Sequence, residues 1–193
     1  MKTLITLCLT VFLSLGLIAQ DDYMEEDNKK ERTIFNNGGI RLSGLWGGST
    51  NGFVKLQNDF SLNNGGYFLF EINENFLIGW SGYGSGTDLP DGTRVSIDGR
   101  DLMLGYTFDS NKAIHPAVYL KTGTGSLEIG DNADDNVSVI EPSIGVELNV
   151  FRFMRIGIDG GYRFVNGVNT TGYSDQDFSS AFIGLRLKFG YSW

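Results

Sequence analysis

The sequence predicts an all-β fold, an eight-stranded antiparallel up-and-down transmembrane β-barrel. The clearest observation is the segment 179–193, SSAFIGLRLKFGYSW, in which every second residue from Ala181 to Trp193 is apolar. The intervening residues are mostly small or charged, so a β-strand here has one apolar face and one polar face. Such a strand at an exposed chain end would aggregate in water, whereas lipid solvates the apolar row of a closed barrel.

The same alternation recurs along the chain between clusters of Asn, Gly, Asp and Ser. It predicts strands at 38–48, 65–73, 76–86, 95–108, 116–129, 138–150, 154–166 and 179–193. A content of 27 Gly against 3 Pro also favours many strands and tight turns. Because Pro142 falls within the sixth predicted strand and cannot donate to the ladder, we expect a bulge there.

The connections between these strands alternate in length, which is the third observation. The long ones are 49–64, 87–94, 130–137 and 167–178. Bacterial outer-membrane barrels alternate short periplasmic turns with longer external loops. The segment 49–64 leaves open a ten-stranded alternative, because its apolar residues could extend the flanking strands or form a separate hairpin.

The first nineteen residues are typical of a secretory signal peptide, since Lys2 precedes an apolar run from Leu4 to Ile18 and Ala19 offers a cleavage point. The run is shorter than the roughly 20 residues that a membrane-spanning helix needs. Cys8 lies within it, so the mature chain has no cysteine for a disulfide. Residues 20–37 are polar and without periodicity, which predicts a flexible periplasmic tail before a barrel domain at 38–193.

Charged residues on the polar register are predicted to face the lumen and to form a structural ion-pair network. They are Arg41, Glu71, Asp101, Lys121, Glu141, Glu147, Arg155, Asp159, Arg163, Arg186 and Lys188. The lumen of an eight-stranded barrel is only wide enough for side chains to fill it, and charges there must be paired. We therefore expect a plugged lumen with no large pore, although a proton or ion path is the alternative.

The long connections are rich in acids, and the formal net charge of −8 argues against a nucleic-acid partner. The acids are Asp59, Asp88, Asp91, Asp131, Asp134, Asp135, Asp175 and Asp177, against Lys55 and Arg94. Oxygen-rich loops can bind Ca²⁺, which makes Asp131, Asp134 and Asp135 a weak metal candidate without EF-hand spacing. Divalent cations shared with anionic surface glycolipid are a further expectation.

No residues are predicted to be catalytic or to bind a cofactor. The single histidine, His115, precedes Pro116 and is expected to be a solvent-exposed residue of a short periplasmic turn. Hydrolytic or acyl-transfer chemistry at the outer leaflet would need a histidine base beside a serine at the opposite end of the barrel. A lipid-modifying enzyme and a soluble lipocalin-like binder, which would need an apolar lumen, remain the alternatives.

The chain resembles the small eight-stranded outer-membrane barrels of the OmpX type and the OmpA membrane domain. The resemblance rests on GIRLSGLWGG (39–48), IEPSIGVELNVFRFMRIGIDGGYRFVNG (140–167) and GLRLKFGYSW (184–193). It implies an insertion signal at Leu187, Phe189, Tyr191 and Trp193, read by the barrel-assembly machinery. It further implies a monomer in the outer membrane with a structural or surface-interaction role and with no cofactor.

Overall fold

The computed structural model describes residues 40–57, 59–90, 92–130 and 133–193. The predicted signal peptide at 1–19 and the predicted tail at 20–37 lie outside the described residues. In the described part of the chain, no helix is long and apolar enough to cross a membrane.

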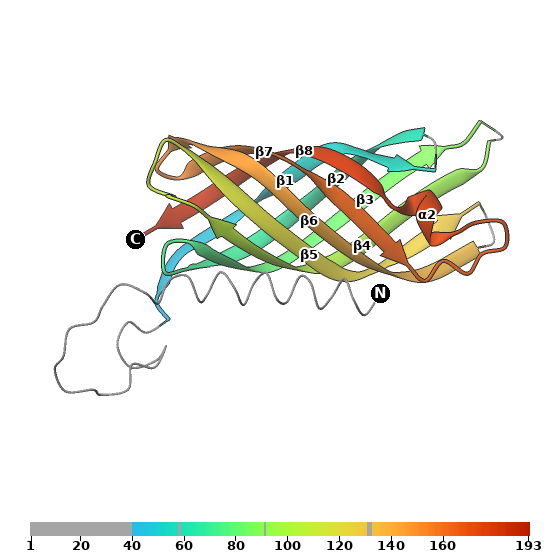
Figure 1. Cartoon of the computed structure of the whole chain (residues 1–193), viewed down its shortest axis with the longest axis horizontal. Coiled ribbons are helices and arrows are strands. Elements are labelled where there is room, and N and C mark those ends of the chain that lie inside the picture. Colours follow the sequence, from blue (N-terminus) through green and yellow to red (C-terminus); the bar gives the residue numbers. More distant parts are fainter. Residues whose placement is uncertain (1–39, 58, 91, 131–132) are drawn as a thin grey trace, which may run out of the picture. The chain divides into compact units, whose positions relative to one another are not determined.

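Eight antiparallel strands close into a barrel in which each strand pairs with its neighbours in the sequence and β8 pairs with β1 (Figure 1). The strands are β1 (Leu42–Leu56), β2 (Asp59–Ile72), β3 (Phe76–Asp88), β4 (Arg94–Thr107), β5 (Ile114–Ile129), β6 (Ala133–Phe151), β7 (Met154–Asn166) and β8 (Ser180–Ser192). The predicted fold is confirmed, and the ten-stranded alternative is wrong because β1 and β2 themselves take up the segment 49–64.

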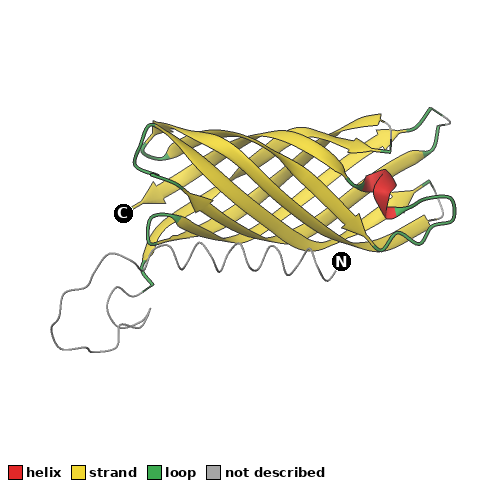
Figure 2. Cartoon of the chain, viewed as in Figure 1, coloured by secondary structure: helices red, strands yellow, loops and turns green. Residues whose placement is uncertain are grey.

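The two ends of the barrel differ in their connections (Figure 2). The turn end carries the connections 73–75, 108–113 and 152–153, together with the start of β1 and the end of β8. The loop end carries 57–58, 89–93, 130–132 and 167–179, and the last of these contains the short helix α2 (Asp175–Phe178). Four long loops were predicted at this end, but only 167–179 remains long, because the strands continue further than their outward apolar residues do.

The polarity of the two strand faces reverses along the barrel. Near the loop end of β4, Ile97 is buried inside and Asp98 is exposed outside. Nearer the turn end, Asp101 is buried inside and Leu102 is exposed outside. A search for apolar residues at every second position therefore ends the strand too early, at the point where the apolar residues change from the outer to the inner face. This explains why 130–137 was predicted to be a loop. In 49–64 apolar residues lie on both faces, with Val54 and Leu56 buried and Phe53, Phe60 and Leu62 exposed, so the alternation is also obscured there.

Two register shifts interrupt the ladders, one between Leu42 and Gly44 and the other between Asn149 and Phe151. The bulge expected at Pro142 is absent. The partners of Ile140 and Ser143 on β7 keep a constant register across it. The missing N–H of Pro142 is thus accommodated without an inserted residue.

Candidate functional site in the barrel interior

The structure buries ten of the eleven charged residues that were predicted to face the lumen, and none of the ten is more than 7% exposed. They are Glu71, Asp101, Lys121, Glu141, Glu147, Arg155, Asp159, Arg163, Arg186 and Lys188. For Arg41 the predicted lumen position is wrong. Its side chain is 62% exposed at the turn end, where it donates to the backbone oxygen of Trp193 at 2.9 Å and faces Glu74 at 3.5 Å. It precedes the register shift between Leu42 and Gly44, beyond the closed part of the ladder.

Glu147 on β6 is the first centre of the network. Its Oε2 accepts a hydrogen bond from Lys188 Nζ at 2.9 Å, and its Oε1 accepts one from the Tyr119 hydroxyl. The Arg186 guanidinium lies 3.9 Å from Glu147 Oε1 and stacks over the Tyr119 ring at 3.6 Å. Arg186 also donates to Asp159 Oδ2 at 2.9 Å. Two cations are thus matched by two carboxylates inside the barrel.

Glu141 forms a second centre further toward the loop end. It accepts hydrogen bonds from Lys121 Nζ at 3.2 Å and from Arg163 Nε. The other guanidinium nitrogens of Arg163 donate to Asn63 Oδ1 at 3.0 Å and to Ser85 Oγ at 3.3 Å. Arg163 therefore connects β7 across the lumen to β2 and β3.

Glu71 on β2 forms the third centre, at the turn end. Its Oε2 accepts from Trp46 Nε1 at 2.9 Å, and its Oε1 accepts from Ser192 Oγ at 2.6 Å. The nearest guanidinium nitrogen of Arg155 is more distant, at 3.6 Å from Oε2. Neutral donors thus occupy both Glu71 oxygens, while Arg155 lies over the Trp46 ring at 4.1 Å.

The interior near the loop end is apolar, which the predicted charged plug did not include. Phe178 of α2 is fully buried against this layer and covers it from the long connection 167–179. The layer consists of Val54, Leu56, Tyr83, Leu89, Val95, Ile97, Leu127, Ile129, Val137, Val139, Val165 and Phe178.

Together these layers determine what the interior can do. A water-filled channel would hydrate the charged side chains that line it, but here they are buried and are bonded mainly to one another. An eight-stranded barrel of this kind is filled by its own side chains. The ion pairs tie the wall together: Lys121–Glu141 joins the neighbouring strands β5 and β6, whereas Arg155–Glu71 joins β7 to the non-neighbouring strand β2.

The prediction that His115 is an exposed turn residue is wrong. Because β5 begins at Ile114, the period-2 alternation places His115 on the inner face. It is fully buried, with Nε2 at 3.5 Å from Glu147 Oε2 and Nδ1 at 3.2 Å from the backbone oxygen of Lys112. The histidine is therefore part of the structural network and not of an exposed site.

The weak calcium candidate divides into described and undescribed parts. Asp131 and the side chain of Asp134 lie outside the described residues. Asp135 is described, and its Oδ2 accepts three hydrogen bonds, from Thr170 Oγ1 at 2.7 Å, Thr170 N at 2.8 Å and Asn169 N at 2.9 Å. Where the chain is described, no group of three His, Cys, Asp or Glu side chains could hold a metal ion. Asp135 anchors the loop 167–179.

Asp175 and Asp177 also accept hydrogen bonds that hold the loop 167–179 in place. Asp175 Oδ1 accepts hydrogen bonds from the backbone amides of Gly167 and Val168, both at 2.9 Å. Asp177 Oδ2 accepts from the amide and the hydroxyl of Ser174, both at 2.8 Å. Acids that were predicted to be solvated loop charges thus also fix the conformation of the loop.

A pH-dependent contact follows from this geometry. Hydrogen bonds from the Thr170 hydroxyl and the Asn169 amide lower the pKa of Asp135. A carboxyl group whose folded pKa is depressed stabilises the fold above its unfolded pKa of about 3.9 and loses this contribution as the pH falls through the folded value. We expect the amide chemical shifts of Asn169 and Thr170 to stay constant from neutral pH to about pH 4 and to move below it. Asp135→Asn should remove this step, and a step well above pH 4 in the wild type would contradict the assignment.

The four residues of the predicted insertion signal lie at the turn end of β8. Leu187 is half-buried, whereas Phe189, Tyr191 and Trp193 are exposed on the outer face. Their outward position follows from the alternation with the buried Arg186 and Lys188.

Sequence reasoning missed several aromatic members of the interior. Trp46, Tyr67 and Tyr119 are buried among the charges, and each ring lies near an arginine or lysine side chain. A signal was present for Tyr119, because it shares the register of Lys121 on β5. Aromatic residues are expected on the lipid face as well, so residue type alone did not indicate the lumen.

Searches for a matching protein-family model and for a matching curated protein found none. Among solved structures, the chain is similar to Neisserial surface protein A, with a TM-score of 0.60 and 10% identity over 80% of this chain and 99% of that one. It is also similar to Ail, the attachment invasion locus protein of Yersinia pestis, in two structures with TM-scores of 0.52 and 0.50, 13% identity and coverage of 77% and 97%. At these identities the likeness concerns the fold. By its fold, the chain is thus a closed eight-stranded antiparallel barrel similar to these two proteins, as its sequence resemblance led us to expect.

Proposed function

We propose that this chain is a bacterial outer-membrane barrel with a structural or surface-interaction role and without a large pore. The observation that carries the proposal is the combination of a filled, ion-paired interior with an apolar outer face. A soluble barrel of the lipocalin type has the opposite arrangement, since its interior is apolar and its exterior is polar.

The apolar outer face forms a band around the turn half of the barrel. Ile144 is 66% exposed and Ile158 is 60% exposed, values that are costly for isoleucine in water. Toward the loop end, outward positions on β4 and β5 such as Asp98 and Thr124 are polar, whereas Phe53, Phe60 and Leu62 on β1 and β2 are apolar and exposed. At the turn end, the rings of Phe76, Tyr106 and Phe108 contact one another, as in the aromatic girdle at a membrane interface.

This band also gives the orientation that we propose. Outer-membrane barrels have short turns in the periplasm and project their loops outward. The turn end then faces the periplasm, and the loop end, whose outer face is polar on β4 and β5 and whose interior is apolar, rises above the membrane. The reversal of strand polarity marks the outer boundary of the bilayer.

The membrane placement predicts that Ile158→Arg lowers the free energy of unfolding by about 2–4 kcal/mol, because the residue lies near the middle of the band. Thr124→Arg, which introduces the same side chain outside the band, should cost less than about 1 kcal/mol. Urea unfolding in lipid vesicles, followed by the shift in gel mobility on heating, measures both. Equal stability of the two variants would contradict the placement.

A closed interior predicts that the purified protein has little or no steady conductance in planar bilayers. The buried ion pairs leave no hydrated path, and the apolar layer under Phe178 is a further barrier. Large, stable and reproducible channels from a homogeneous sample would contradict the closed lumen.

The excess of acidic residues at the loop end indicates which charge a surface partner of this barrel would carry. Ail has been crystallised in complex with the heparin analogue sucrose octasulfate, a polyanion. Around the loop end of this chain, Asp88, Asp135, Asp175 and Asp177 outnumber Lys55 and Arg94. The acidic rim favours cationic partners, or divalent cations shared with anionic surface glycolipid, over sulfated polysaccharides.

An enzymatic role has less support, because the single histidine is buried beside Glu147 on the side of the barrel away from the outer leaflet. The outward residues Leu187, Phe189, Tyr191 and Trp193 fit recognition by the barrel-assembly machinery. We further propose that the barrel is monomeric, since its band is suited to lipid.

A further inference from the structure

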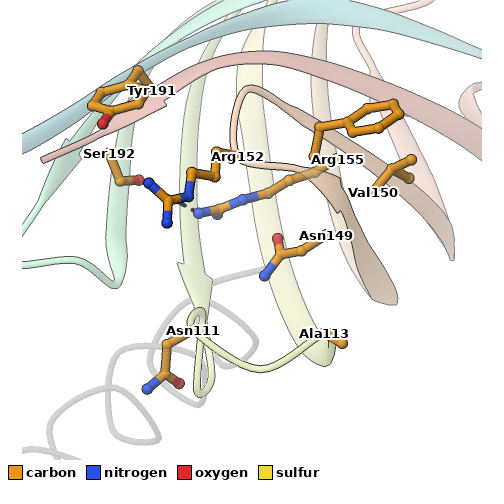
Figure 3. Close-up of a pocket in the computed structure, with 9 residues that line it drawn as sticks. Asn111, Ala113, Asn149, Val150, Arg152, Arg155, Tyr191 and Ser192 are labelled. Atoms are coloured by element: carbon orange, nitrogen blue, oxygen red, sulfur yellow. Dashed lines mark hydrogen bonds between the residues drawn. The ribbon is translucent and has the colours of Figure 1, made fainter.

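The turn end contains an open concavity of about 730 Å³ (Figure 3). It lies between the connections 108–113 and 152–153 and the end of β8. Its polar lining comprises Asn111, Asn149, Arg152, Arg155 and Ser192. Its volume is within the range of small-molecule sites in proteins.

Arg155 in this concavity has unused donor capacity. Its side chain is only 8% exposed, yet among the described residues its one side-chain hydrogen bond is from Nη2 to Ser192 Oγ at 3.4 Å. Nη1 is buried without a hydrogen-bond partner among the described residues, and its nearest carboxylate oxygen, Glu71 Oε2, is an ion-pair contact at 3.6 Å. A guanidinium has five N–H donors, and buried donors are normally satisfied.

A second cation accompanies it. Arg152 lies exposed in the connection between β6 and β7 and forms no ion pair with any described residue. Figure 3 shows both guanidinium groups reaching toward Ser192. None of the residues that line the concavity is acidic, in a chain whose formal net charge is −8. Behind the lining, Glu71 lies 3.6 Å from Arg155, so two guanidinium groups face one carboxylate and the local charge is positive against the average of the molecule.

The chemistry of the lining selects a phosphate group. Paired guanidinium groups bind phosphate oxygens through charge-assisted, bidentate hydrogen bonds. Val150, Phe151 and Tyr191 also line the concavity, and all three are exposed at the edge of the apolar outer face. A ligand that fits both parts is an amphiphile with an anionic head.

From this geometry we propose that the concavity binds the phosphate of a phospholipid from the membrane leaflet at the turn end. The acyl chains would follow the apolar outer face of β6 to β8. This inference rests on the proposed membrane placement. A failure of that placement would appear in the Ile158→Arg comparison, whereas a failure of the lipid site would appear only in lipid binding.

The test uses the folded barrel in uncharged maltoside micelles, titrated with dioctanoyl phosphatidylglycerol and followed by native mass spectrometry. We expect one tightly bound lipid, and a loss of affinity of about tenfold in Arg152→Gln, because a charge-assisted hydrogen bond is removed. The matched control is Arg100→Gln, which removes an exposed arginine on the outer face of β4, away from the turn end. Asn111→Asp should weaken binding comparably by adding a negative charge to the lining without altering either arginine. Unchanged affinity in both variants would overturn the proposal.

Two further probes separate the parts of the ligand. Dioctanoylglycerol, which has the same chains without phosphate, should not compete, and equal binding would overturn the anion site. Glycerol phosphate, which has the head without the chains, should bind much more weakly, and equal binding would overturn the choice of a lipid. The Nε resonance of Arg155 should shift with the phospholipid in the wild type and in Arg100→Gln, which locates the ligand.

Discussion

Glu147→Ala will lower the free energy of unfolding of the barrel by about 3–5 kcal/mol, the cost of removing one partner from a buried ion pair. Lys188 is bonded to Glu147 at 2.9 Å, and Arg186 lies 3.9 Å from it. Without the carboxylate, Arg186 would keep Asp159, Lys188 would have no ion-pair partner among the described residues, and the Tyr119 hydroxyl would lose its acceptor. Urea unfolding in lipid vesicles, followed by tryptophan fluorescence, measures the change.

The matched control is Glu128→Ala on the outer face of β5 near the loop end. Glu128 is exposed, and its contact with Ser96 Oγ is long, at 3.4 Å. A surface substitution of this kind changes stability by less than about 0.5 kcal/mol. If Glu147→Ala were no more destabilising than Glu128→Ala, the interior network would not hold the barrel together.

Phe178→Ala will have the second large effect, about 3–5 kcal/mol if the side chain is as well packed as its complete burial indicates. Phe178 covers the apolar layer at the loop end and contacts the Tyr173 ring at 6.0 Å between centroids. Its loss opens that layer to water and releases the connection 167–179. Protease cleavage within this connection should accelerate along with the fall in stability.

Gln176→Ala is the control for this substitution, because it truncates an exposed side chain of the same helix. Its stability and cleavage rate should match those of the wild type. Rapid cleavage in both variants, or in neither, would show that Phe178 does not hold the connection in place.

The sequence by itself determined the order of the strands and the facing of the turn half, and it favoured eight strands, although only the structure excluded ten. An apolar surrounding outside and a packed interior require opposite polarities at alternate residues. In a closed barrel, Arg186 and Lys188 must therefore face the lumen and Leu187 must face outward. The terminal strand and the strands β6 and β7 were predicted within a few residues for this reason. Ten of the eleven lumen charges follow from the same rule.

Only the tertiary structure decided which charges meet, because alternation assigns a face and not a partner. Arg163 reaches Asn63 across the lumen, 100 residues away, and this depends on the stagger of all eight strands. Two assignments changed at strand ends. The register shift beside Arg41 leaves this residue at the rim, and the early start of β5 at Ile114 places His115 in the lumen. The apolar layer under Phe178 was hidden because the polarity of the faces reverses along strands such as β4, where Ile97 is inside and Asp98 outside; in the proposed placement this part lies in water, which again favours apolar residues inside.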